Sequence, residues 1–122
     1  DANLTIWCDE DTPLIWPEVL RAVSGHALGT VLEDSDELLT ELMSPDGLDR
    51  MRAYLSANPP ASILQRRRIV SAFLDKFALA DRIDLELDIP DWSEEMVETL
   101  TTNYRQDIAR IRTLSGVTLI EA

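Results

Sequence analysis

Three adjacent acidic side chains, Asp9, Glu10 and Asp11, are the first residues whose type could support chemistry. They follow the apolar run from Leu4 to Cys8, which has the composition of a β-strand, and residues just after strands often carry function. Carboxylate oxygens are preferred ligands of Mg²⁺, so a cation site is one interpretation. On an extended segment, however, successive side chains point to opposite sides. We therefore favour a polar turn that leads into a helix, whose positive end stabilises nearby acids.

Arg66, Arg67 and Arg68 form a run of three cations. Arginine binds phosphate and carboxylate groups through paired hydrogen bonds, which makes the three candidate contacts to an anionic ligand or at an interface. On a helix, successive side chains point about 100° apart, so only some of the three can converge on one ligand. We therefore favour ion pairs with acidic side chains over an anionic ligand, and nucleic acid least of all.

The single histidine and the single cysteine are the remaining reactive types. A histidine that acts as a general base needs a nucleophile or a carboxylate within reach, and the residues around His26 suggest none, so we expect an exposed loop histidine. Cys8 ends an apolar run and has acidic neighbours, which predicts a buried small side chain and not a reactive thiolate.

Composition and charge limit the function further. The chain has 122 residues and a formal net charge of −12, which disfavours binding to nucleic acid because like charges repel. Its 4 glycines form no phosphate-binding loop, and no metal-ligand motif is present, so we expect no cofactor in this chain. It has no run of about 18 apolar residues, which predicts no membrane partner and, with one unpaired cysteine, a cytoplasmic location.

The hydrophobic pattern predicts a mainly α-helical fold with about five helices and a short β-strand near each end. A single domain or fragment is expected to span residues 1–122. The helices are expected at residues 13–24, 35–43, 45–57, 62–77 and 93–114, and the strands at about residues 3–8 and 117–120.

Local signals support these boundaries. Ser44 before Pro45, the capping-box pair Ser62 and Gln65, and Ser93 all predict helix starts. The apolar faces are expected to include the following residues: Val19, Leu20 and Val23 in the first helix; Leu38, Leu39, Leu42 and Met43 in the second; Leu48, Met51 and Leu55 in the third; Ile69, Val70, Phe73, Leu74 and Phe77 in the fourth; Val97, Leu100, Tyr104, Ile108 and Ile111 in the last. Residues 83–89 alternate between apolar and polar, which indicates an extended segment, although a short helix from Ala78 to Leu87 fits equally well.

The two predicted strands leave one question open. Two strands of four or five residues are not an independently stable sheet, so they either pair with each other or join strands outside this sequence. Because a β-type run begins within the first residues, we expect the chain to be part of a longer protein and to begin in the middle of its fold.

The order of these segments resembles a known family. Residues 4–11 and 17–25 resemble the late strand, Glu-Asp pair and following helix of the P-loop sulfotransferases, although Thr12 stands where those enzymes usually have leucine. Nearly the whole chain, including residues 104–111 and 116–120, is similar to the C-terminal part of a group of bacterial sulfotransferase-like proteins of unassigned function.

The resemblance implies a larger α/β parent that binds 3′-phosphoadenosine 5′-phosphosulfate on an N-terminal P-loop. That loop and the catalytic base precede the matched part, so no catalytic or donor-binding residue transfers to this chain. The first hypothesis is thus a non-catalytic C-terminal region that packs against the parent and forms a wall for the acceptor. The alternative is a non-enzymatic, acidic, helical interaction module whose partner is another protein or a second copy of the chain.

Overall fold

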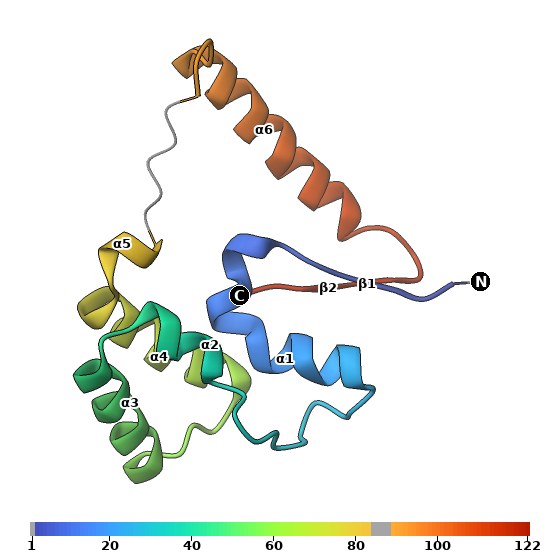
Figure 1. The fold of residues 1–122 in the computed structure, drawn as a ribbon. Coiled ribbons are helices and arrows are strands. Elements are labelled where there is room, and N and C mark those ends of the chain that lie inside the picture. Colours follow the sequence, from blue (N-terminus) through green and yellow to red (C-terminus); the bar gives the residue numbers. More distant parts are fainter. Residues whose placement is uncertain (1, 84–88) are drawn as a thin grey trace. The chain divides into compact units, whose positions relative to one another are not determined.

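The computed structural model describes residues 2–83 and 89–122, and these residues are mainly helical with a short strand near each end (Figure 1). They fall into two compact units. The larger unit contains residues 7–83 and 120–122, and the smaller unit contains the described residues of 1–6 and 86–119. The elements in chain order are β1 (Leu4–Trp7), η1 (Asp9–Asp11), α1 (Thr12–Ser24), α2 (Glu37–Leu42), α3 (Pro45–Ala57), α4 (Ile63–Phe77), α5 (Ala80–Ile83), α6 (Glu94–Ile111) and β2 (Val117–Ile120).

The five predicted helices and both strands are present, with differences at their ends. The second helix begins at Glu37 and not at residue 35, because residues 33–36 form a turn in which Asp34 has a left-handed backbone conformation (φ 55°). The last helix ends at Ile111 and not at residue 114. The short element η1 was not predicted as a helix. Helix α5 (Ala80–Ile83) falls within the short helix from Ala78 to Leu87 that was one of the two alternatives left open. The uncertain segment 83–89 falls mostly on residues 84–88, which lie outside the described residues.

The predicted helix caps are confirmed. Ser44, Ser62 and Ser93 each accept a hydrogen bond from the backbone N–H three residues later, at 3.1–3.2 Å. The Gln65 side chain also folds back over the helix start, but it accepts from the N–H of Ala61 at 2.6 Å, one residue before the N-cap donor that a capping box uses. Gly25 ends α1 with φ 72°, a conformation that glycine adopts without steric cost.

The larger unit has a hydrophobic core built by α2, α3 and α4. Its buried side chains are Leu39, Met43, Leu48, Met51 and Val70. The junction of α2 and α3 is tied to the end of α4 by backbone hydrogen bonds from Ser44 to Phe77 and from Leu79 to Leu42. Helix α1 also contacts α4 and contributes the fully buried Ile15. The expected α1 face is wrong at its end, since Val23 is 74% exposed; Val23 lies in the last turn of α1, beyond its buried part.

The smaller unit has no comparable core among its described residues, because none of the residues in α6 is buried. Strands β1 and β2 pair with each other, with a backbone hydrogen bond of 2.9 Å from Leu4 N–H to the carbonyl of Gly116. This resolves the pairing that the sequence left open. Among the described residues, no helix combines the length and the apolar character needed to cross a lipid bilayer.

Candidate functional site

The acidic run Asp9–Asp11 forms a 3₁₀ turn and not an extended segment. The hydroxyl of Thr12 donates a hydrogen bond to Asp9 Oδ1 at 3.3 Å, and the N–H of Ala122 donates to Asp11 Oδ2 at 3.5 Å. In the part of the chain that the structure describes, no group of three or more histidine, cysteine and acidic side chains is arranged to hold a metal ion. The turn is followed directly by α1, which begins at Thr12, as expected of a polar turn that leads into a helix.

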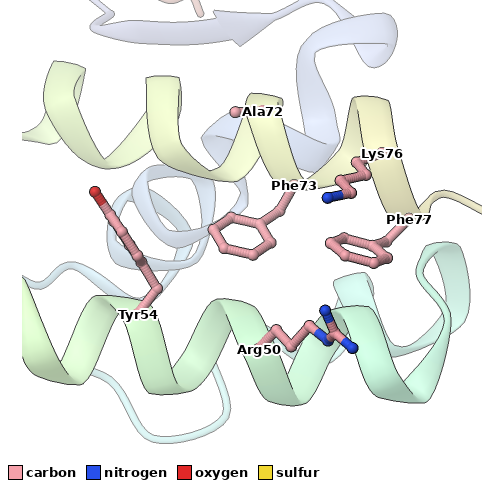
Figure 2. Close-up of a pocket in the computed structure, with 6 residues that line it drawn as sticks. All are labelled: Arg50, Tyr54, Ala72, Phe73, Lys76 and Phe77. Atoms are coloured by element: carbon pink, nitrogen blue, oxygen red, sulfur yellow. The ribbon is translucent and has the colours of Figure 1, made fainter.

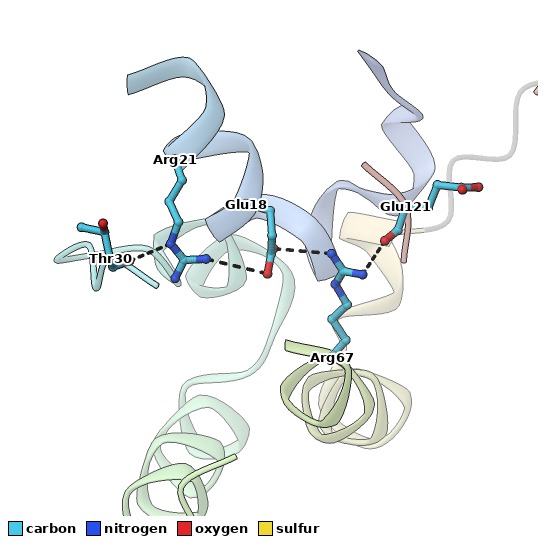
Figure 3. Close-up of polar contacts among 5 residues, drawn as sticks. All are labelled: Glu18, Arg21, Thr30, Arg67 and Glu121. Atoms are coloured by element: carbon cyan, nitrogen blue, oxygen red, sulfur yellow. Dashed lines mark hydrogen bonds and ion pairs between the residues drawn. The ribbon is translucent and has the colours of Figure 1, made fainter. Parts of the chain in front are cut away.

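Arg67 contacts an acidic side chain that the sequence analysis did not single out. Its Nη2 lies 3.9 Å from Oε2 of Glu18, a residue of α1 that is only 5% exposed (Figure 3). The same guanidinium donates through Nη1 to the backbone carbonyl of Glu121. A buried carboxylate is costly unless it is paired, so Arg67 compensates the charge of Glu18 and joins α1, α4 and the end of the chain.

A second arginine contacts Glu18 from its own helix. Arg21 Nη1 lies 3.9 Å from Glu18 Oε1, and Arg21 Nε donates to the carbonyl of Thr30 at 2.6 Å (Figure 3). Glu18 is thus held between two arginines whose side chains are about 15% exposed. This arrangement is an internal ion cluster of two pairs at 3.9 Å, which links α1 to α4 and, through Arg21 and Thr30, to the loop after α1.

Among the described residues, Arg67 is the member of the run that forms an ion pair with Glu18. Arg66 is half-buried, and burial lowers the pKa of its guanidinium while the charge of Glu18 acts in the opposite direction. Arg68 is exposed. Because Arg67 already has carboxylate and carbonyl partners, the geometry favours the ion-pair interpretation of the run over a site for an external anion.

His26 has a local partner that the sequence analysis missed. Its Nδ1 lies 2.8 Å from the Oγ of Ser24, two residues earlier. The Ser24 hydroxyl donates to the helix carbonyl of Leu20 at 2.7 Å, so its oxygen accepts from the imidazole. A serine nucleophile would have to give its proton to the histidine, whereas the Ser24 hydroxyl is placed to donate to the carbonyl of Leu20. As expected, His26 is exposed and Cys8 is buried.

A surface groove of about 410 Å³ lies between α3 and α4. Figure 2 shows Arg50 and Tyr54 projecting from α3 and the rings of Phe73 and Phe77 projecting from α4. Ala72 and Lys76 complete the lining. The rings are arranged in contact, with centroids 5.8 Å apart for Tyr54 and Phe73 and 6.0 Å for Phe73 and Phe77.

Two cations lie over one ring of this groove. Arg50 and Lys76 lie 5.8 and 5.4 Å from the centroid of Phe77, within the range of cation–π attraction. Arg50 also pairs with Asp46 one helical turn away at 3.0 Å, with both side chains exposed. The groove therefore combines an aromatic wall with two cations, a composition suited to an apolar group that carries a neighbouring negative charge.

Close packing of the two helices positions these rings. Gly47 in α3 is buried, and a Cβ at this position would lie only 2.3 Å from Cβ of Phe77. Glycine is therefore required for the observed approach of α3 to α4. The sequence did contain a signal for the groove, because Arg50 and Tyr54 lie four residues apart on α3, as do Phe73 and Phe77 on α4. We assigned the two phenylalanines to the core face alone, and both are in fact half-buried.

Comparison of the chain with family models, curated proteins and solved structures finds no match.

Proposed function

We propose that this chain is a non-enzymatic interaction module, and that the groove between α3 and α4 binds a segment of a partner protein. The segment carries an aromatic or aliphatic anchor residue next to acidic residues. The observation that supports this most directly is the groove itself, in which Tyr54, Phe73 and Phe77 present a partly exposed aromatic wall beside Arg50 and Lys76.

The expectation that the partner has an apolar anchor residue rests on how binding energy is distributed over protein interfaces. Binding energy concentrates in a few residues, often aromatic side chains and arginine that fill or line a pocket. Tyr54 is 46% exposed, so a bound apolar side chain would remove apolar surface from water at about 25 cal/mol per Å². The groove thus offers an apolar contact that a peptide side chain can use.

The acidic character of the partner follows from charge. The chain as a whole has a formal net charge of −12, whereas the groove has two cations within 6 Å of the centre of the Phe77 ring. The pair between Arg50 and Asp46 is exposed, and exposed pairs contribute at most about 1 kcal/mol. A carboxylate of the partner can therefore replace Asp46 at little cost.

Other parts of the chain support a binding role better than a catalytic one. The Glu18 cluster is internally paired, and the Ser24 hydroxyl is not activated by His26. The relation to sulfotransferases stays a prediction, since none of the comparisons supplies a relative that would test it. A cytoplasmic location belongs to the same proposal and is compatible with the free thiol of Cys8.

The test is fluorescence polarisation with the full chain and two labelled ten-residue peptides. One peptide alternates Glu and Asp with Leu and Trp, and the other has Lys in place of every acid. We expect saturable binding of the acidic peptide alone. Lys76→Glu should weaken it by about tenfold, equivalent to about 1.4 kcal/mol.

The matched control is Arg68→Glu. It changes the net charge by the same amount on the same helix, but Arg68 does not line the groove. We expect it to change the affinity by less than about twofold, since distant exposed charges are largely screened. Equal binding of both peptides, or equal weakening by both variants, would contradict the proposal.

A further inference from the structure

Helix α6 carries an apolar seam that is separate from the groove. Its members recur at a spacing of three and four residues, about 3.5 residues per turn, which is the spacing of helices that pair along their length. Val97, Leu100 and Tyr104 are 46%, 42% and 44% exposed, and Ile108 and Ile111 are half-buried. An amphipathic helix buries such a stripe against another element, and no residue of α6 is buried.

Charged residues beside this seam form a self-complementary pattern. Glu98 and Arg105 are both exposed and lie seven residues apart, so they share one flank of the helix. At about 1.5 Å per residue they are roughly 10 Å apart along the axis, too far to pair within one helix. Glu94 and Glu95 extend the acidic part towards the N-terminus, and Arg110 extends the basic part towards the C-terminus.

We propose that α6 pairs in antiparallel orientation with α6 of a second copy of the chain. This orientation brings the same flank of both helices together, with Glu98 of each copy opposite Arg105 of the other. With residue 98 opposite residue 105, the seams coincide to within two residues, about 3 Å along the axis, so Val97 lies near Ile108 and Leu100 lies near Tyr104 of the other copy. One antiparallel arrangement therefore brings the apolar seams into contact and places opposite charges next to each other.

The parallel orientation is less favourable. It places Glu94 and Glu95 of the two copies side by side at one end, and like charges across a helix interface select against pairing. It also aligns the two helix dipoles, whereas the antiparallel pair brings the positive end of each helix to the negative end of the other.

The same pattern argues for a second copy and not for an unrelated partner. A two-fold interface brings one surface patch against itself, so that patch must be complementary to its own inverted image. The first half of α6 carries Glu94, Glu95 and Glu98, and the second half carries Arg105 and Arg110 with the single acid Asp107. The charge therefore changes from acidic to net basic about a point near residues 101–102, which meets this condition. A partner of different sequence would not require this symmetry.

The pair is expected to be weak and concentration-dependent. One pair of 18-residue helices lies at the low end of interface sizes, and two copies with a net charge of −12 repel each other at long range. Dissociation at low concentration therefore follows from the proposal.

Sedimentation velocity of the full chain in 0.15 M salt, over a wide concentration range, tests the pair. The wild type should change from monomer to dimer as its concentration rises. E98R and R105E each turn two attractive contacts into repulsive ones, and each should weaken dimerisation by about tenfold or more. An equimolar mixture of the two variants restores both attractive contacts and should recover the dimer as a heterodimer.

The control is Lys76→Glu, which changes the groove and not α6, and should leave the dimer unchanged. A wild type that stays monomeric at every concentration would overturn the proposal. So would a dimer that persists in E98R alone, or a mixture that associates no better than its components. The mixture is decisive because it restores charge complementarity without restoring either original sequence.

Discussion

Helices α4 and α6 have similar sequence patterns and different environments. Both are amphipathic, both begin after a serine cap, and both span at least four turns. Helix α4 buries Val70 completely between its neighbours, whereas no residue of α6 is buried. An amphipathic pattern thus specifies that a face needs a partner, but it does not specify the partner. For α4 the partners include α3, which precedes it by five residues.

Truncation of an apolar side chain should give the largest difference in lost stability between the two units. Met51 is fully buried, and Met51→Ala should lower the free energy of unfolding by about 2–5 kcal/mol because it leaves a cavity. Leu100→Ala in α6, at dilute protein concentration, should change it by less than about 1 kcal/mol. Urea titration followed by far-UV circular dichroism measures both variants, and equal losses would show that α6 is as well packed as α3.

The internal ion cluster gives the next largest effect. Glu18→Gln removes the charge that compensates Arg21 and Arg67, and breaking a buried pair in this way costs about 3 kcal/mol. Glu95→Gln removes an exposed charge in α6 and should cost no more than about 0.5 kcal/mol. The same urea titration compares them, and a neutral Glu18→Gln would mean that the cluster does not hold α1 on α4.

The close approach of α3 to α4 can be tested by substituting Gly47. Gly47→Ala places a Cβ against Phe77, and such overpacking should destabilise the larger unit by about 1–3 kcal/mol, even though alanine favours helix formation. Gly29→Ala is the matched control, since a Cβ there meets nothing within 4 Å. Thermal unfolding should show a lower midpoint for the first variant alone, and a stabilised Gly47→Ala would refute the close approach.

The smallest effect compares two caps of equal geometry. Ser62 and Ser93 both accept a backbone hydrogen bond at 3.1 Å, and loss of a cap costs about 1 kcal/mol. Ser62→Ala should raise hydrogen exchange across α3 and α4, because their folding is coupled through the core. Ser93→Ala should raise exchange only within α6. Exchange that spreads from α6 into α3 would contradict the separation of the two units.

Local chemistry explains what the sequence predicted well. The positions of α3, α4 and α6 follow from Ser44, Ser62 and Ser93, and a serine cap depends only on residues within one turn. The core face of α4 follows from its spacing in the same way. A polar turn at Asp9–Asp11 was predicted, but its 3₁₀ conformation was not, because a run of acids does not specify the backbone conformation.

Long-range contacts explain what the sequence could not predict. Nothing near Glu18 indicates burial, because its environment depends on Arg67, which is 49 residues away. The groove depends on Gly47, whose effect appears only once α4 lies against it. Candidate sites built between segments therefore escape an analysis that compares each residue with its near neighbours.

Residues 120–122 belong to the same unit as residues 7–83, and Arg67 binds the carbonyl of Glu121. The chain thus leaves the larger unit and returns to it, so the segment that contains α6 is topologically an insertion with both ends anchored. The entropy of closing such an excursion increases only with the logarithm of its length, about 0.6 kcal/mol per doubling. Lengthening or shortening this insertion should therefore be tolerated far better than any change in spacing between α3 and α4.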